Sequence, residues 1–350
     1  MSINNVAKTL KLEQHIVYMT EKTNRSPYLV SLLFAFVVWG SWLVYTYPNS
    51  WAVIQSHWRV SVTMIFGSII AGATSEGGGA IAFPVFTKAL QISPSDAKVF
   101  SLAIQSVGMV AASIAIIMMR VQVLWRVVGW VSLGGVVGLF IGSVLLSPLL
   151  ASDIIRMLFT VMAVSLAFTL IRLSTGFRLN HRYMPEIGLR ETGILLVVGI
   201  VGGIVSGLVG SGIDMICFSV LVLLFRISES IATPTSVILM AINSFFGVLL
   251  HIFIFAGINA QVQSYWLAAV PIVVVGAPLG AYFCSRMHYL HIRYLLIALI
   301  SIELVTSLWL LDFDRTLIIF SISMLVLFLA VMISMSRARF YVRSSRQECL

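Results

Sequence analysis

The chain has 350 residues, of which 59% are hydrophobic and only 10% are charged. Soluble domains carry about 25% charged residues, so this composition excludes an ordinary soluble domain. The formal net charge of +9 is concentrated in loops and tails, where it marks membrane topology rather than a phosphate-binding face. We therefore expect no nucleic-acid partner, and the three widely spaced cysteines predict neither a disulfide framework nor a zinc site.

Apolar runs recur along nearly the whole chain, and about 20 such residues are enough for one crossing of a bilayer. We predict an all-α polytopic protein of the cell inner (plasma) membrane, in contact with bilayer lipid and with both termini cytoplasmic. In chain order we expect a cytoplasmic N-terminal segment (1–28), a first transmembrane helix (29–47), repeat 1 (59–173), a cytoplasmic linker (174–191), repeat 2 (192–311), a last transmembrane helix (316–336) and a basic cytoplasmic tail (337–350).

The two repeats are defined by glycine-rich segments that match at an offset of 135 residues. The first match pairs Gly72 with Gly207, and ten of the 30 positions from 72 to 101 are identical to their counterparts. Further along, Gly138 and Gly142 recur at an offset of 138, as Gly276 and Gly280. Glycines four residues apart allow helices to approach closely in lipid, so we assign these later glycines to packing.

The glycine motifs predict a broken, re-entrant helical segment in each repeat, at 59–91 and 193–225. Non-helical backbone is tolerated at membrane depth only where it is buried in protein or lines a wet cavity. Each half-helix that starts after a break presents unpaired N–H groups and the positive end of its dipole. Two such ends meeting near the midplane of the membrane would form a cradle for an anion.

The distribution of basic residues distinguishes two arrangements of the repeats. If each glycine segment crosses the membrane once, the repeats are parallel, and 14 of the 22 Lys and Arg residues lie inside. If each segment dips in and returns, the repeats are inverted, and the count inside rises to 17. The positive-inside rule favours inverted repeats, with an extra helix at each end of the chain.

Polar residues near the breaks are the candidates for binding substrate, although hydrogen bonding between helices is the alternative role of those outside the glycine motifs. The candidates are Ser75, Gly77, Gly78, Gly79, Gln105, Ser211, Gly212, Ser236 and Asn243. The same sequence offers no catalytic group with a convincing partner and no metal-ligand spacing. We expect no cofactor, and we cannot read the oligomeric state from these patterns.

Three acids, Glu76, Asp214 and Glu303, fall inside apolar segments. An intramembrane carboxylate is costly and marks a functional site by default. Glu76 and Asp214 lie within the glycine motifs, where they either bind protons, coordinate a cation or cap their own half-helices. Glu303 is near a segment end, from which its side chain can reach the interface.

Two other classes of function were weighed. Gly210-Ser211-Gly212 together with His251 invites comparison with an intramembrane serine protease, but the usual Gly-x-Ser-Gly would need glycine at Val209. A non-transporting membrane scaffold would have no need of an acid within each symmetry-related break. Both readings are less favoured than transport.

The glycine motifs, the following apolar stretch with Pro84 and the later paired landmarks resemble the TauE/SafE family, also called the 4-toluene sulfonate uptake permease family. The resemblance covers about residues 59–311 and implies a secondary transporter of small anions, with sulfite and organosulfonates such as sulfoacetate as associated substrates. By motif position it carries over Gly77–Gly79 and Ser211-Gly212. The chain departs from the family pattern at Glu76, Asp214 and Ser219, where the second motif often has proline.

We therefore predict a secondary transporter of a small anion such as sulfite or an organosulfonate, working as an exporter coupled to protons. The alternative is a cation-coupled importer of small carboxylates or sulfonates. In either case Glu76 and Asp214 are the residues expected to bind the coupling ion.

Overall fold

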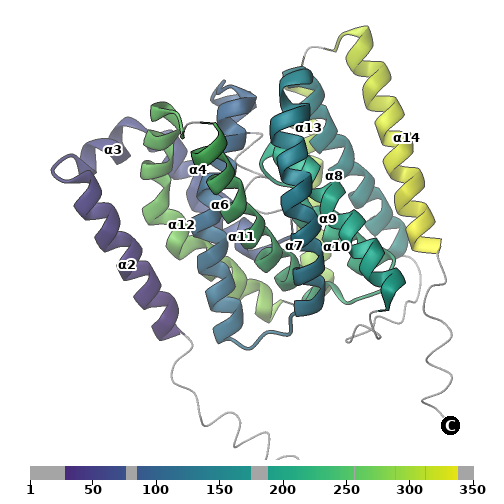
Figure 1. The fold of residues 1–350 in the computed structure, drawn as a ribbon, viewed down its shortest axis with the longest axis horizontal. Helices are drawn as coiled ribbons and strands as arrows, with labels where there is room; N and C mark the ends of the chain where they lie inside the picture. Colours follow the sequence, from purple (N-terminus) through teal and green to yellow (C-terminus); the bar gives the residue numbers. More distant parts are fainter. Residues whose placement is uncertain are drawn as a thin grey trace, which may run out of the picture.

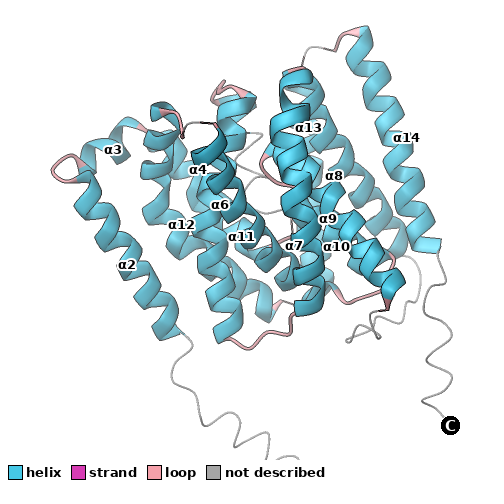
Figure 2. Cartoon of the chain, in the orientation of Figure 1, coloured by secondary structure: helices cyan, strands magenta, loops and turns pink. Residues whose placement is uncertain are grey.

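The computed structural model describes residues 28–75, 85–174, 188–255, 257–287, 289–311 and 313–337. Over these ranges the regular structure is helical, without strands (Figure 2). Nine of the described helical segments are long and apolar enough to cross a bilayer, which confirms an all-α polytopic membrane protein. The glycine motif residues Glu76, Gly77, Gly78 and Gly79 lie outside the described residues.

The helices lie side by side in one bundle, with α2 and α14 at its two edges (Figure 1). In chain order they are α2 (Tyr28–Thr46), α3 (Ser50–Ser56), α4 (Trp58–Ala73), the π-helical turn η1 (Val85–Ala89), α6 (Pro94–Met118), α7 (Trp125–Phe140), η2 (Ile141–Leu146), η3 (Ser147–Leu149), α8 (Ser152–Ser174), α9 (Leu189–Val209), α10 (Ile213–Leu223), α11 (Glu229–Ile254), α12 (Ala260–Arg286), α13 (Tyr289–Leu310) and α14 (Arg315–Arg337). The helices α7, η2 and η3 form one continuous span.

The bundle has two ends, which we call the terminal face and the distal face. The terminal face is the end at which α2 begins and α14 ends (Figure 1). The distal face is the opposite end, where α2 finishes and its Tyr45 hydroxyl accepts a hydrogen bond from Gln263 of α12, at 2.8 Å. At the same end the ring of His57, just before α4, packs edge-on against Tyr265 of α12.

Polar contacts place the other helix ends on these two faces. At the distal face, α6 begins beside α12, since Asp96 lies 3.5 Å from the Asn259 amide. At the terminal face, α6 ends beside α12, since the Ser285 hydroxyl contacts the Met119 sulfur. The helices α4 and α6 thus both begin at the distal face. The chain from residue 58 to residue 93 therefore starts and ends at the same face.

The closest helix contacts are made by glycines, and they occur in reciprocal pairs. A Cβ on Gly142 of α7-η2 would meet the carbonyl of Ile204 on α9, and a Cβ on Gly280 of α12 would meet the carbonyl of Ile69 on α4. These are the same pair of positions in the two repeats, because Gly142 corresponds to Gly280 and Ile69 to Ile204. In each case the helix that opens one repeat packs, backbone to backbone, against a later helix of the other repeat: α9 against α7-η2, and α4 against α12.

A second reciprocal contact extends this pattern. A Cβ on Gly72 would meet the backbone of Ala277 and Ala281, and a Cβ on Gly207 would meet the equivalent backbone of Leu139 and Ser143. The sequence analysis assigned the later glycines to packing, and these contacts confirm that role. They also add Gly72 and Gly207, the first residues of the two glycine motifs, to the same interfaces.

The backbone just before α6 and the backbone just before α11 have the same local conformation. The non-glycine residues Gln91 and Arg226, 135 positions apart, have positive φ values of 53° and 54°. The next residues, Ile92 and Ile227, donate equivalent backbone hydrogen bonds of 2.9 Å, to Phe86 and Leu221 respectively. The sequence duplication is thus accompanied by a duplicated local conformation.

We predict that Gly138→Ala destabilises the protein, because its Cβ would meet the backbone of Ile200 on α9 and force α7 and α9 apart. Overpacking of this kind costs about 1–3 kcal/mol. The matched control is Gly129→Ala on the same helix, where a Cβ would have no neighbour within 4 Å. The midpoint of thermal unfolding in detergent should fall for the first variant and stay level or rise for the second; equal midpoints would contradict the packing account.

Candidate functional site

The second glycine motif breaks the path between α9 and α10. The helix α9 ends at Val209, Gly210 has φ +92°, Gly212 has φ +136°, and α10 begins at Ile213. Such φ values favour glycine, because side chains on L-residues clash there. Side chains also surround the break closely, since a Cβ on Gly212 would lie 2.5 Å from Val205.

Two side chains of α6 hold the break in position. The Gly210 carbonyl accepts hydrogen bonds from the Ser101 hydroxyl at 3.2 Å and from the Gln105 amide at 3.1 Å. These residues lie seven and eleven positions after the start of α6, or about 10 and 16 Å along a helix about 37 Å long. The break therefore lies inside the depth that α6 spans, closer to its distal end than to its terminal end.

Asp214 and Ser206 satisfy the first N–H groups of α10. Asp214 Oδ1 accepts from the backbone N–H groups of Gly212 and Met215, both at 3.0 Å. Ser206 Oγ accepts from Ile213 N, also at 3.0 Å. Of the roles weighed for Asp214, the one seen in this conformation is that of a carboxylate capping its own helix.

The remaining polar atoms of the break have no such partners. Several buried side-chain atoms at the predicted site residues make no hydrogen bond among the described residues: Ser75 Oγ, Gln105 Oε1, Ser211 Oγ, Asp214 Oδ2 and Asn243 Oδ1. Buried polar groups are nearly always paired, so a set of unpaired atoms calls for an explanation. Four of these atoms, on Gln105, Ser211, Asp214 and Asn243, belong to residues at the second break.

Asn243 of α11 lies close to the start of α10, and both adjoin Gly135 of α7. A Cβ on Gly135 of α7 would meet both Asn243 Oδ1 and the Ile213 side chain. The Asn243 amide donates to the Leu239 carbonyl in its own helix at 2.9 Å. The oxygen of this amide thus lies beside the start of α10.

The candidates Ser236 and Ser75 correspond by position to two residues of the second break, Ser101 and Gly210. Ser236 is the counterpart of Ser101, and its hydroxyl donates to the Thr233 carbonyl of α11 at 2.8 Å. Ser75 is the counterpart of Gly210 and follows the end of α4, fully buried. Of the predicted residues, the described structure brings together Gln105, Ser211, Gly212, Asp214 and Asn243 around the second break.

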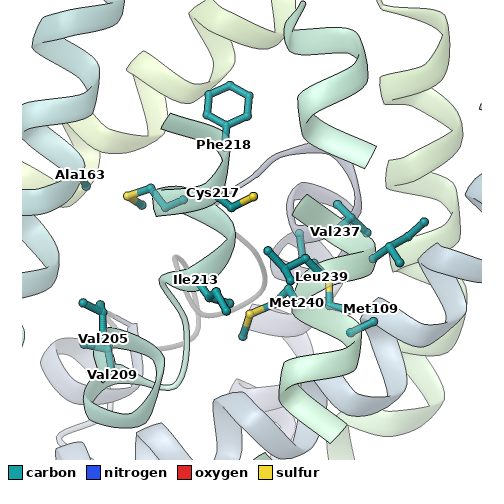
Figure 3. Close-up of a cluster of buried hydrophobic side chains, with 14 of the residues drawn as sticks. Met109, Ala163, Val205, Val209, Ile213, Cys217, Phe218, Val237, Leu239 and Met240 are labelled. Atoms are coloured by element: carbon teal, nitrogen blue, oxygen red, sulfur yellow. The ribbon is translucent and has the colours of Figure 1, made fainter. Parts of the chain in front are cut away.

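Apolar packing fixes α10 around this site. Ile213, Cys217 and Phe218 of α10 lie in a buried cluster with Val205 of α9 and Val237 of α11 (Figure 3). All five side chains are at most 5% exposed. The break is therefore surrounded by a rigid apolar wall, within which an unpaired polar atom is costly.

Two residues of the site were missed in the sequence analysis. Ser101 was not among the candidates, although it is one of the ten identities between the repeats and pairs with the candidate Ser236. Ser206 offers no comparable signal, because a single hydroxyl in an apolar run is common in membrane helices.

Two expectations about acids need correction. Glu303 was expected to reach the interface, but it is buried and accepts hydrogen bonds from Thr160 of α8 and Ser307 of its own helix. The count of buried acids also omitted Glu229, which is fully buried and forms an ion pair with Arg293. Glu229 begins α11 and Arg293 lies in the second turn of α13.

The residues considered for a serine protease are not arranged for that chemistry. His251 Nδ1 contacts the Gly247 carbonyl of its own helix at 2.9 Å, and Ser211 Oγ has no hydrogen-bond partner in the described chain. A nucleophilic serine needs a base within hydrogen-bond reach. The His251 contact is instead one within its own helix, as expected of a packed side chain.

Fold and site together define a polytopic membrane protein with a buried polar site at a helix break. The model of the sulfite exporter TauE/SafE family matches residues 60–310, and the chain belongs to this family. The family is one of membrane transporters, so this chain is a transporter of the sulfite-exporter type rather than an enzyme. No curated protein and no solved structure matches the chain.

We predict that Asp214→Ala lowers the stability of the protein, because it leaves the Gly212 and Met215 N–H groups buried without an acceptor. Each unsatisfied group costs about 1–3 kcal/mol. Asp214→Asn keeps an acceptor oxygen and should unfold close to the wild-type temperature. If the two variants show the same midpoint of thermal unfolding, Asp214 does not act as the cap.

Proposed function

We propose that the chain is a secondary transporter that exports a small anion such as sulfite or an organosulfonate, with proton movement coupled through Asp214. Membership of the exporter family supports the class of substrate. The observation that carries the proposal is the group of buried, unpaired polar atoms around a helix break inside the depth that α6 spans. A plain packing kink would be expected to pair these atoms.

The proposal includes inverted repeats, each with a re-entrant segment that returns to the face it entered. Residues 58–93 begin and end beside the start of α12, at the distal face. Residues 189–228 run between the end of α8 and the start of α11, where Glu229 pairs with Arg293 of α13. The placement of residues 58–93 agrees with the inverted arrangement, in which 17 of the 22 basic residues lie inside.

Asp214 supplies a physical route for coupling. When ionised, its carboxylate occupies the N–H groups that an oxyanion would otherwise use. Protonation weakens the carboxyl group as an acceptor and releases those donors. Anion binding and protonation of Asp214 would therefore favour each other, and the anion and the proton would travel together.

The direction of transport follows from the gradients. A doubly charged anion that carries one proton has a net charge of −1, so an inside-negative potential drives it outward by about 2.3 kcal/mol per 100 mV. An inwardly directed proton gradient opposes this movement. Export therefore requires that the anion gradient and the membrane potential together exceed the proton gradient.

A second candidate is the cation-coupled importer of small carboxylates or sulfonates. The unpaired atoms at the break include three oxygen acceptors, on Gln105, Asp214 and Asn243. Oxygen acceptors of this kind are the ligands that hard cations prefer. Dependence of transport on a sodium gradient rather than on pH would favour this candidate.

The test is uptake by liposomes that contain the purified protein, with sulfite, small sulfonates and short carboxylates, under an imposed pH or sodium gradient. We expect sulfite or sulfonate uptake to respond to the pH gradient. Asp214→Asn should lose this response by about tenfold or more, equivalent to about 1.4 kcal/mol. The control is Asp153→Asn, because Asp153 forms a partly exposed ion pair on α8.

No uptake of any of these anions under either gradient would refute the proposal. If uptake does not depend on the pH gradient and Asp214→Asn transports as well as wild type, proton coupling is refuted. A sodium-dependent response would replace the exporter with the importer.

A further inference from the structure

A polar cavity of about 230 Å³ opens among helix ends near the terminal face. It lies between the end of α4, the end of α6, the start of α11 and the end of α12. Its polar lining includes Gln122, Ser230, Thr233 and Ser285, and the described lining residues carry no ionisable acid or base other than the Cys284 thiol. A cavity of this size suits a small hydrated solute, since drug-sized ligands occupy about 300–1,000 Å³.

The cavity reaches the first glycine motif from the terminal face. Gly72, in the last turn of α4, lines it. Three residues further on, the Ser75 hydroxyl is buried and has no hydrogen-bond partner. The cavity thus leads toward the end of α4 from the face at which α2 begins and α14 ends (Figure 1).

Thr233 is the side chain that marks the cavity as a binding site. It is 1% exposed, its hydroxyl makes no hydrogen bond, and it lines the cavity. Thr233 stands in the second turn of α11, whose N-terminal end carries the positive end of the helix dipole. The hydroxyl is therefore a buried donor without a protein partner, one turn beyond the start of α11.

The surrounding charges are compatible with an anion. The nearest acid in sequence, Glu229, is paired with Arg293, so its negative charge is compensated. Pro234 follows Thr233 and has no N–H, so the usual helical donor to the Ser230 carbonyl is missing. A hydrated anion satisfies both kinds of group, because its water can donate to that carbonyl while an oxygen accepts from Thr233.

We propose that this cavity is an entry vestibule that binds a small oxyanion at Thr233 before it reaches the glycine breaks. This inference rests on the proposed transport function and adds to it a second anion subsite, on the terminal face. It assigns specificity to neutral hydroxyl donors at the mouth of the pathway. The buried Asp214 then acts at a separate, deeper step.

The chain contains its own reporter for this cavity. Cys284 lines it and is 8% exposed, whereas Cys217 lies beside the second break and is 1% exposed. A variant with Cys217→Ser and Cys349→Ser keeps Cys284 as the single thiol. A second variant with no native cysteine and with Ser285→Cys places an exposed thiol at the same cavity.

The experiment measures the rate at which a membrane-impermeant maleimide modifies these thiols in vesicles of either orientation. Methanesulfonate is the probe anion, because it does not react with maleimide, and gluconate at the same ionic strength is the bulky control. We expect modification from the terminal face only. Methanesulfonate at about four times its dissociation constant should slow it about fivefold, and gluconate should not.

Thr233→Val should abolish the protection without abolishing modification, and Thr233→Ser should retain both. A variant with Cys217 as its only thiol should stay unmodified. The inference is overturned if neither reporter is modified from the terminal face, or if methanesulfonate protects wild type and Thr233→Val equally.

The outcome is separable from that of the transport assay. Protection at Cys284 without uptake into liposomes would support the vestibule and refute the transport proposal. Uptake without protection would leave the transporter standing and remove the vestibule.

Discussion

Everything in this structure depends on how closely two pairs of helices approach one another. The helix α9 lies against α7, and α4 lies against α12, at separations that leave no space for a Cβ. In lipid such contacts are a main source of association between helices, because there is little hydrophobic gain from burying apolar surface. Because each repeat supplies one helix to each pair, neither repeat can be packed correctly without the other. The helix break at Gly210 is held in place by this arrangement, since α9 carries it to the level of Ser101 and Gln105 on α6.

The second constraint is the treatment of polar groups at membrane depth. Around the break, some groups are paired within the protein, as in the cap that Asp214 and Ser206 form on α10. Others, such as Ser211 Oγ and Asn243 Oδ1, are left unpaired inside an apolar wall. This division gives the proposed mechanism its form: the paired groups hold the structure when the anion is elsewhere, and the unpaired groups are those that a ligand can satisfy. The cavity at Thr233 repeats the same principle nearer the surface.

Much of the fold was predictable from the sequence, because the residues that match between the repeats include glycines, which have few structural roles. Gly142 and Gly280 permit close packing and little else, and Gly212 permits a positive φ. The site was predictable where a polar residue stands alone in an apolar run, as Asp214 and Asn243 do. It was not predictable where partners come from distant segments. The pairing of Glu229 with Arg293 and the burial of Glu303 against Thr160 depend on α13 packing beside α11 and α8, which no local pattern encodes.

We propose that the repeats are inverted, so that the linker between them lies on the same side of the membrane as both chain ends. The most direct measurement is the labelling of His181→Cys in the linker, in a cysteine-free chain, by a membrane-impermeant maleimide in intact cells. Asn49→Cys, between α2 and α3, is the control, because it lies outside in both the inverted and the parallel arrangement. The account predicts that Cys at 49 is labelled in intact cells, whereas Cys at 181 is labelled only after the cells are permeabilised. Labelling of both positions in intact cells would contradict the inverted arrangement.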